Sequence, residues 1–474
     1  MAAVDVPEGF AGTMRPYQHE GLAWLALLWD HRLGGILADD MGLGKTLQAL
    51  AMMLRARQAD PDGPPFLVLA PASVVHGWQQ EAARFAPDLC VRTVDATLAK
   101  LGTTATAVAA GADVVITSYT RFRLDAEAYA EVGWAGLLLD EAQAVKNPRS
   151  KLYGCIRRLP VPFALAITGT PLENDLMELW SLLSITSPGL FPNPSVFKEM
   201  YVTPIQRNHD RERLARLRRR IRPLVLRRTK EEVAADLPPK QEQVLSVELT
   251  PAHRKVYDGW LQRERRKVLG LMADLDEHRF TVLRSLTLLR RASLHAGLVE
   301  DRHERVASAK IDVLVSHLHE VVAGGHRALV FSQFTSFLSL VRDRLDREGI
   351  DHVYLDGATR NREAVVGAFK DGSAPVFVIS LKAGGVGLNL TEADYCFLLD
   401  PWWNPATEAQ AIDRTHRIGQ TRRVMVYRLI AAGTIEEKVL DLSQRKAALF
   451  DGVMDDGRPF AGRLDADDIR ALME

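Results

Sequence analysis

The stretch that decides the fold class of this chain is Ala38-Asp39-Asp40-Met41-Gly42-Leu43-Gly44-Lys45-Thr46. It follows a short apolar segment, residues 35–38, and precedes a helix-like run from Leu47 to Arg57. Backbone N–H groups of a glycine loop at a helix N-terminus can wrap a phosphate chain, and the helix dipole favours its negative charge. The order of strand, glycine loop and helix therefore indicates an α/β unit with a polyphosphate site.

Two side chains of this loop are expected to act on the polyphosphate directly. Lys45 would reach the terminal phosphates, and the Thr46 hydroxyl would bind Mg²⁺. Asp39 stands where the strict pattern has its first glycine, so a plain glycine turn is the alternative. We favour an ATP site, because later segments supply matching chemistry. Its predicted loop contacts are Met41, Gly42, Leu43, Gly44, Lys45 and Thr46.

The overall composition is that of a globular protein. Its 474 residues suffice for about three domain-sized units. The 60 Lys and Arg residues equal the 60 Asp and Glu residues, so no global field would attract nucleic acid. Three separated cysteines suggest neither disulfides nor a zinc site. Because no apolar run approaches the roughly 18 residues of a membrane span and no secretory signal is visible, we expect an intracellular, cytoplasmic protein with no membrane partner.

Two sets of short apolar runs alternate with helical patterns along the chain. Runs this short and apolar fit strands buried on both faces of a parallel sheet. Their alternation with helices indicates an α/β, doubly wound fold, and two sets predict two lobes. The strand candidates are Ile36–Ala38, Phe66–Ala70, Val114–Thr117, Leu137–Asp140 and Leu165–Thr168 in the first set, and Ala328–Phe331, Val353–Leu355, Val376–Ser380, Cys396–Leu399 and Val424–Leu429 in the second.

The region between the two sets, residues 174–309, reads as mostly helical. Its clearest helices are His253–Leu271 and Phe280–Leu294, and the run Asp236-Leu237-Pro238-Pro239 marks a break. We therefore expect four segments. They are a first lobe over residues 10–235 with a helical insertion after about 174, an inter-lobe helical segment over 236–309, a second lobe over 310–450, and a tail over 451–474.

A basic stretch lies inside that helical region. Its apolar residues Leu214, Leu217 and Ile221 share one helical face. The arginines are then either a solvated face or contacts to a phosphate backbone, and the sequence leaves both readings open. They are Arg211, Arg213, Arg216, Arg218, Arg219, Arg220, Arg222, Arg227 and Arg228.

Two polar segments follow apolar runs of the first set. Residues 137–143 end in Asp140 and Glu141, which would lie at the carboxyl edge of the sheet, where open α/β folds bind ligands. Asp140 is placed to hold Mg²⁺ and Glu141 to deprotonate the attacking water, although acids at strand ends also cap helices. The hydroxyls of Thr168 and Thr170 would sense the phosphate state, with a plain turn as the alternative.

The second half carries an arginine-rich segment, residues 410–420. Thr407 with Gln410 could form a capping box and Gly419 a stop, which predicts a short helix. Two guanidiniums on one helical face suit the charge on a transferring phosphoryl group, and the alternative is a surface salt bridge between Asp413 and Arg417. The residues predicted to share that face are Gln410, Asp413, Arg414 and Arg417.

In this order the segments resemble the helicase-like ATPases of superfamily two and, more narrowly, the SWI/SNF-related DNA translocases. The resemblance covers residues 15 to about 449. Arg15–Gly21 resembles the family's adenine-recognition segment, in which Gln18 would read the base, and Gly433–Lys438 resembles the helix that braces the two lobes. Further matching segments are Asp39–Thr46, Leu69–Gln79, Thr117–Thr120, Asp140–Gln143, Gly169–Asn174, Leu226–Lys230, Asp236–Lys240, Val330–Phe334, Leu355–Gly357, Ser380–Thr391 and Asp413–Gln420.

The resemblance implies two RecA-like lobes with helical insertions, in a monomeric motor that uses ATP and Mg²⁺ to move along double-stranded DNA. A DNA-bound protein complex is a further implied partner, and a bacterial member would be nucleoid-associated. The implied catalytic residues are Lys45, Asp140, Glu141, Arg414 and Arg417, with Thr46 and Asp140 on the metal. The implied coupling residues are Gln143, Thr168 and Thr170. The implied nucleic-acid contacts are Ser73, Thr117, Tyr119, Ser332, Gln333, Lys382 and Gly385.

Two positions depart from the family's pattern: Gln143 replaces a usual histidine, and Thr415 replaces a common alanine. Trp402 and Trp403 could stack on bases, but tryptophans beside a buried strand more often belong to the core. Two other function classes remain as alternatives. One is a strand-separating DNA or RNA helicase, and the other is an ATP-gated scaffold without turnover.

Overall fold

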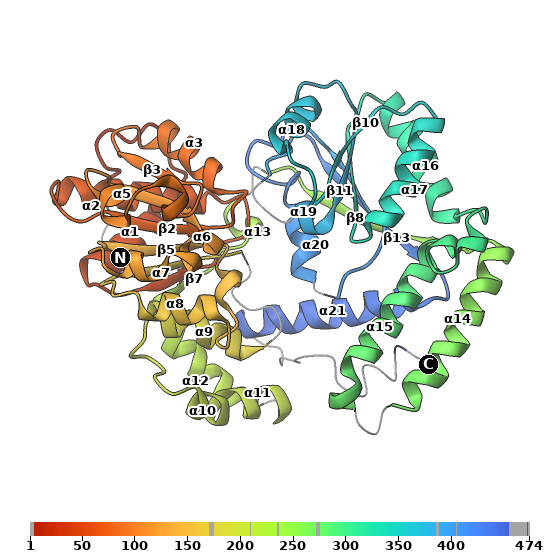
Figure 1. The fold of residues 1–474 in the computed structure, drawn as a ribbon, viewed down its shortest axis with the longest axis horizontal. Coiled ribbons are helices and arrows are strands. Elements are labelled where there is room, and N and C mark those ends of the chain that lie inside the picture. The colour runs from red at the N-terminus through yellow and green to blue at the C-terminus, as the bar shows by residue number, and fades with distance from the viewer. Residues whose placement is uncertain are drawn as a thin grey trace. The chain divides into compact units, whose positions relative to one another are not determined.

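The chain divides into two compact units. The computed structural model describes residues 4–169, 175–208, 210–234, 237–271, 275–384, 388–403, 405–454 and 472. The first unit comprises residues 1–235 with 449–462, and the second comprises residues 236–448 with 463–474. Figure 1 shows a strand layer flanked by helices in each unit. No helix within these described ranges has the length and apolar character needed to span a bilayer.

The first unit is built on a seven-stranded sheet in the order β3-β4-β2-β5-β6-β1-β7, in which every pair is parallel. Its strands are β1 (Gly35–Leu37), β2 (Phe66–Ala70), β3 (Val91–Val94), β4 (Val114–Ser118), β5 (Gly136–Asp140), β6 (Ala164–Ile167) and β7 (Val225–Leu226). Its helices are α1 (Pro16–Asp30), α2 (Lys45–Ala59), α3 (Val75–Phe85), α4 (Leu98–Leu101), α5 (Ala105–Ala109), α6 (Tyr119–Leu124), α7 (Ala126–Ala130), α8 (Lys151–Arg158), α9 (Leu176–Thr186), α10 (Pro194–Phe197), α11 (Thr203–Asn208), α12 (Arg211–Ile221) and α13 (Lys230–Val233).

The second unit is built on a six-stranded sheet in the order β10-β11-β9-β12-β13-β8, again with every pair parallel. Its strands are β8 (Lys240–Val247), β9 (Ala328–Ser332), β10 (His352–Leu355), β11 (Val376–Ser380), β12 (Tyr395–Leu398) and β13 (Val424–Ala431). Its helices are α14 (Pro251–Leu269), α15 (Leu275–Leu294), α16 (Ala309–Ala323), α17 (Thr335–Arg347), α18 (Arg362–Lys370), α19 (Leu381–Gly384) and α20 (Pro405–Ile412), and α21 (Ile435–Met454) begins there.

Each sheet has an apolar core on both faces, because successive side chains of a strand point to opposite sides. Along β2, Leu67 and Leu69 join one core cluster, while Phe66 and Val68 join another. The second sheet repeats the pattern along β9. The expectation of two doubly wound α/β lobes is confirmed, and the ten predicted strands correspond to β1, β2, β4, β5, β6, β9, β10, β11, β12 and β13.

The prediction that residues 174–309 are mostly helical is confirmed, but the range also contains two strands that were not predicted. Strand β7 adds to the first sheet beside β1, and β8 adds to the second sheet beside β13. Residues 240–247 lie at a sheet edge with mostly exposed side chains, so they carry no apolar run for a pattern to detect. The segment expected to lie between the lobes therefore contributes a strand to the second one.

Candidate functional site

The glycine loop between β1 and α2 adopts a conformation that only its glycines permit. Gly42 and Gly44 have φ angles of 88° and 77°, in the left-handed region that other residues rarely enter. A Cβ atom on Gly44 would lie 2.5 Å from Nε2 of Gln18. Both the backbone twist and the close approach therefore demand glycine at position 44.

Gln18 lies against this loop. Its Nε2 donates to the carbonyl oxygen of Leu43 at 3.1 Å, and the Tyr17 hydroxyl donates to the same oxygen. The other end of the amide accepts a hydrogen bond from the Arg15 backbone N–H, which fixes the side chain at the start of α1. Thus Gln18 and the loop form one rigid wall, although base recognition by Gln18 stays a prediction.

Asp39, which replaces the first glycine of the strict pattern, is fully buried and paired. The Arg228 guanidinium grips its carboxylate in a fork, with Nε at 3.0 Å and NH2 at 2.5 Å. Arg228 also donates to Oε1 of Gln48 and to the Tyr17 carbonyl. Strand β7 brings the arginine here, since it runs beside β1 and Asp40 N–H donates to the Arg228 carbonyl. Sequence reasoning missed both Arg228 and Gln48 as supports of this loop.

Lys45 begins α2 and bends back over the loop. Its Nζ donates to the carbonyl oxygens of Asp39 at 2.6 Å and Asp40 at 3.1 Å. Desolvation of the ammonium lowers its pKa, against the nearby charges of Glu141, Asp39, Asp140 and Asp40. These carbonyl contacts hold the Lys45 ammonium at the glycine loop, and its contact with a terminal phosphate stays a prediction.

Asp140 ends β5 in a buried, hydrogen-bonded setting. Its Oδ2 accepts from the Trp78 indole N–H at 2.8 Å, and its Oδ1 accepts from the Glu141 backbone N–H. Burial raises its pKa to about 7, and the charge of Glu141 acts in the same direction. A neighbouring positive charge would therefore stabilise the ionised form of Asp140. Trp78 was not singled out from the sequence, because nothing local couples it to residue 140.

Glu141 lies at the head of a chain of side-chain hydrogen bonds. Nε2 of Gln143 donates to its Oε2 at 2.9 Å, and the Thr168 hydroxyl donates to Oε1 of Gln143 at 3.2 Å. Glu141 has φ 48°, a strained backbone typical of functional sites. The chain joins the ends of β5 and β6, so the structure brings Glu141, Gln143 and Thr168 together. Thr170 falls outside the described residues.

Three residues predicted to contact nucleic acid are turned inward. The Thr117 hydroxyl is buried on the Val94 carbonyl, and the Tyr119 hydroxyl donates to the Asp140 carbonyl. Ser332 is fully buried, with its hydroxyl on Asp400. In this conformation the three hydroxyl groups are hydrogen-bonded within their own units, and their contact with nucleic acid stays a prediction. Thr117 and Ser332 lie in strands whose residues are all buried, and a hydroxyl buried in this way has to be paired.

The other predicted contacts differ in exposure. Ser73 is exposed in the loop after β2, and Gln333 is half-buried after β9. The side chain of Lys382 and the whole of Gly385 lie outside the part of the chain that the structure describes.

The predicted helix over the arginine-rich segment is wrong in its extent. Helix α20 begins at Pro405 and ends at Ile412, so Arg414 and Arg417 lie in the turns that follow it. The chain leaves the helix because the Arg414 carbonyl accepts from the Leu390 N–H instead of continuing the helical ladder. The two guanidiniums still converge, since each donates to the Leu388 carbonyl. Arg414 is 1 % exposed and Arg417 is half-buried.

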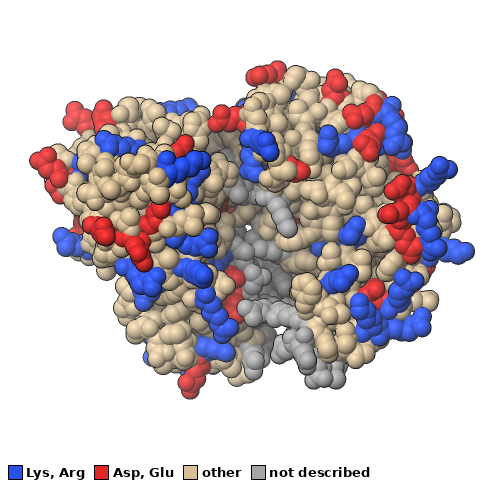
Figure 2. Space-filling model, in the orientation of Figure 1, with Lys and Arg blue, Asp and Glu red and all other residues tan. Residues whose placement is uncertain are grey.

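The basic helix α12 is amphipathic, as expected. Leu214, Leu217 and Ile221 are buried, whereas Arg216 and Arg219 are exposed. Figure 2 shows basic and acidic side chains together on the visible face, without one extended basic field. Whether the exposed arginines contact phosphate or only water stays open.

Comparison with known families decides the class of this chain. The family model for the SNF2-related domain matches residues 17–298, and that for the helicase conserved C-terminal domain matches residues 309–419. The chain is a member of the SNF2-related family of helicase-like ATPases. The resemblance read from its motifs is thereby confirmed.

Individual relatives of this SNF2-related chain come from bacteria and eukaryotes. YwqA of Bacillus subtilis (strain 168), whose name assigns it provisionally to the ATP-dependent helicases or translocases, is 36% identical over 96% of this chain and 50% of its own length. The ISWI chromatin-remodeling complex ATPase ISW1 of Saccharomyces cerevisiae is 32% identical over 96% of this chain and 42% of its own length. The chain thus spans about half the length of these relatives.

A solved structure described as the Sulfolobus solfataricus SWI2/SNF2 ATPase core in complex with dsDNA is 30% identical. The comparison covers 100% of this chain and 99% of that one, with a TM-score of 0.49.

Proposed function

We propose that this chain is the motor of an ATP-driven translocase that moves along double-stranded DNA and displaces or remodels proteins bound to it. The observation that carries the proposal is the hydrogen-bonded chain from Glu141 through Gln143 to Thr168, beside Lys45 and Asp140. Glu141, the proposed base, and Lys45, the proposed phosphate-binding cation, both follow strands of one sheet at its carboxyl edge, which is where α/β folds bind nucleotides.

The site residues of the first unit have distinct parts in the proposed hydrolysis. Lys45 binds the terminal phosphates and offsets their charge. Glu141 accepts a proton from the attacking water, and Gln143 holds that carboxylate in position through its 2.9 Å hydrogen bond. Gln18 and the wall it forms with Leu43 orient the base of the nucleotide.

The residues present fit a Mg²⁺ ion held mainly by substrate phosphates and water. Mg²⁺ proteins of this kind supply only one or two ligands of their own, and Asp140 and Thr46 provide that number. No cluster of three or more His, Cys, Asp or Glu side chains that could hold a metal occurs among the described residues. When bound, the ion would neutralise charge that develops on the phosphates.

The second unit carries two arginines for which we also propose a catalytic part. The guanidiniums of Arg414 and Arg417 converge on the Leu388 carbonyl, and a pair of this kind suits the charge of a transferring phosphoryl group. Residues that follow β9 and β12, at the carboxyl edge of the second sheet, are the proposed surface for the DNA backbone. Support for a DNA substrate comes from the remodeler and translocase names of the relatives.

The deciding experiment measures ATP hydrolysis by the purified chain, alone and with duplex DNA, single-stranded DNA or RNA. Strong stimulation by duplex DNA is the expected result. A preference for single strands together with strand displacement would support an unwinding helicase instead, and the lack of any turnover would support the scaffold alternative.

The matched variants are Glu141→Gln and Glu127→Gln. The first should retain ATP binding but lose turnover by about 10²-fold or more, because the general base is gone. The second changes an exposed acid of the same unit and should leave turnover intact. Near wild-type hydrolysis by Glu141→Gln would show that the base has been assigned to the wrong residue.

A further inference from the structure

A buried carboxylate ties together two loops at the carboxyl edge of the second sheet. Oδ1 of Asp400 accepts from the Ser332 hydroxyl at 2.5 Å and from the Gln333 backbone N–H at 3.3 Å. Ser332 ends β9, and Asp400 follows β12, which pairs with β9. Asp400 thus connects the turn after one central strand to the turn after its neighbour.

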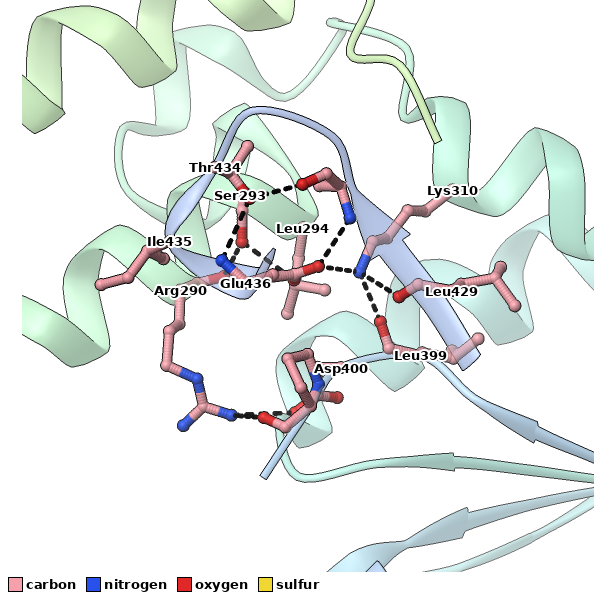
Figure 3. A network of polar contacts seen from close by, with 12 residues as sticks. Arg290, Ser293, Leu294, Lys310, Leu399, Asp400, Leu429, Thr434, Ile435 and Glu436 are labelled. Carbon is pink, nitrogen blue, oxygen red and sulfur yellow. Dashed lines mark hydrogen bonds and ion pairs between the residues drawn. The ribbon is translucent and has the colours of Figure 1, made fainter. Parts of the chain in front are cut away.

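The partner of that carboxylate comes from outside the sheet. Arg290 lies in the last turns of α15, and its NH2 is 3.5 Å from Oδ2 of Asp400 and donates to the Pro401 carbonyl. Figure 3 shows Arg290 reaching toward Asp400 from its own helix. The guanidinium carbon is 5.5 Å from the Phe334 ring centre, 5.4 Å from that of Trp402 and 5.1 Å from that of Trp403. One side chain therefore contacts both loops at once.

The burial of these groups differs from that of the loops they hold. The side chains of Arg290 and Asp400 are 3% and 1% exposed. The residues above them, Gln333, Phe334 and Trp402, are only half-buried and so remain accessible to a ligand. A buried charged pair lies directly beneath a partly open surface at the sheet edge, where α/β folds bind ligands.

A second buried ion pair, Lys310 with Glu436, also holds helix α15 and serves as a comparison for the Arg290 pair. Lys310 donates to Oε2 of Glu436 at 2.5 Å and to the carbonyls of Leu399 and Leu429, so it pins the ends of β12 and β13 (Figure 3). Oε1 of Glu436 accepts from the hydroxyl of Ser293, one turn after Arg290. Burial lowers the pKa of Lys310, and the other described side-chain hydrogen bonds of this pair go to Ser293, Leu399, Leu429 and Ala431.

Stability alone does not account for the Arg290 pair. Replacing a buried ion pair by well-packed apolar side chains is often neutral or stabilising, so an ion pair in this place points to a geometric role. A planar guanidinium suits that role, because it can stack on aromatic rings while its NH2 group contacts both the Asp400 carboxylate and the Pro401 carbonyl.

We propose that Arg290 is a positioning residue that holds the loops 332–334 and 400–403 in the geometry with which the second unit engages the DNA backbone. The inference rests on the proposed function and names the residue that prepares its DNA surface. Arg290 itself touches neither ATP nor DNA in this proposal.

The first test compares Arg290→Lys with Lys310→Met. Arg290→Lys keeps the charge but loses the NH2 contacts and the flat stacking face. The duplex concentration for half-maximal stimulation should therefore rise about tenfold, as for the loss of one charge-assisted hydrogen bond. Basal hydrolysis and the KM for ATP should stay within twofold of wild type. Lys310→Met should lower the unfolding temperature without moving the DNA dependence. If both variants shift the DNA dependence equally, or neither does, the positioning role is refuted.

The second test does not need DNA stimulation. Hydrogen exchange at the backbone amides of residues 333, 334, 402 and 403 should accelerate about tenfold in Arg290→Lys, and protection in β11 should be unchanged. Unchanged exchange at those four amides would refute the positioning role even in a folded, active variant. Absence of nucleic-acid stimulation in the wild-type chain, with faster exchange in the variant, would overturn the proposed function but leave the loop-holding role standing.

Discussion

Replacing Arg228 by methionine should destabilise the first unit far more than the loss of a surface charge. The variant leaves the Asp39 carboxylate fully buried, with Nε2 of Gln48 at 3.4 Å as its remaining side-chain donor. It removes two charge-assisted hydrogen bonds, at 3.0 and 2.5 Å. Breaking a buried ion pair from one side costs about 3–5 kcal/mol, and the value here should lie in that range.

The matched control is the exposed pair of the same unit. Arg55 and Asp30 form two 2.9 Å contacts, but their side chains are 31% and 48% exposed. Arg55→Met should therefore cost less than about 1 kcal/mol. Because a chain with two units need not unfold in one step, the assay is denaturant-dependent hydrogen exchange read from peptides of β1 and α2.

A double variant separates the lost pair from general disruption. Adding Asp39→Asn to Arg228→Met removes the uncompensated charge, so the double variant should be more stable than Arg228→Met alone by roughly 1–3 kcal/mol. If Arg228→Met costs no more than Arg55→Met, or if the two changes at the buried pair simply add, the reasoning about Asp39 fails.

Two further predictions concern the nucleotide loop and the response to acid. Gly44→Ala should weaken ATP binding at least tenfold in a nucleotide titration. The φ of 77° at this position costs an alanine about 1–2 kcal/mol, and the added Cβ would meet Gln18. The control, Gly154→Ala, has open space around the added Cβ and should bind ATP normally. Burial lowers the pKa of both His253 and His295, so the folded second unit favours their neutral forms. Its unfolding free energy should therefore be highest above a pH of about 6.5 and should fall as the pH drops below that value, until the folded-state pKa values are passed. The His253→Asn and His295→Asn double variant should lose most of that slope in thermal melts from pH 7.5 to 5.5, and an unchanged slope would contradict this assignment.

The parts of the fold that could be predicted are those with a local signal. Strands such as β2 and β11 are continuous apolar runs, and their position in the chain order is enough to place Asp140 and Glu141 at one sheet edge. Gly44 could be predicted as well, since a left-handed turn before a lysine and a helix is a local requirement.

The supports of the site could not be predicted, because their partners are distant in the chain. Asp39 and Arg228 are 189 residues apart, and Trp78 meets Asp140 from 62 residues away. No local pattern carries either pairing. The predicted helix extended too far for a related reason. The Arg414 carbonyl accepts a hydrogen bond from the Leu390 N–H, and hydrophobic periodicity carries no information about that contact.

The polar edge strand β8 has a consequence for how the chain is made. Its partner in the sheet begins at Val424, paired with Lys240 and synthesised about 180 residues later. At roughly 5–20 residues per second, a ribosome would leave β8 without that partner for about 10–40 s. Unpaired apolar strands aggregate, whereas charges such as Lys240 and Glu242 discourage pairing with the wrong chain. The exposed polar side chains of β8, which leave it without an apolar run, thus disfavour aggregation of the nascent chain until β13 is made and pairs with β8.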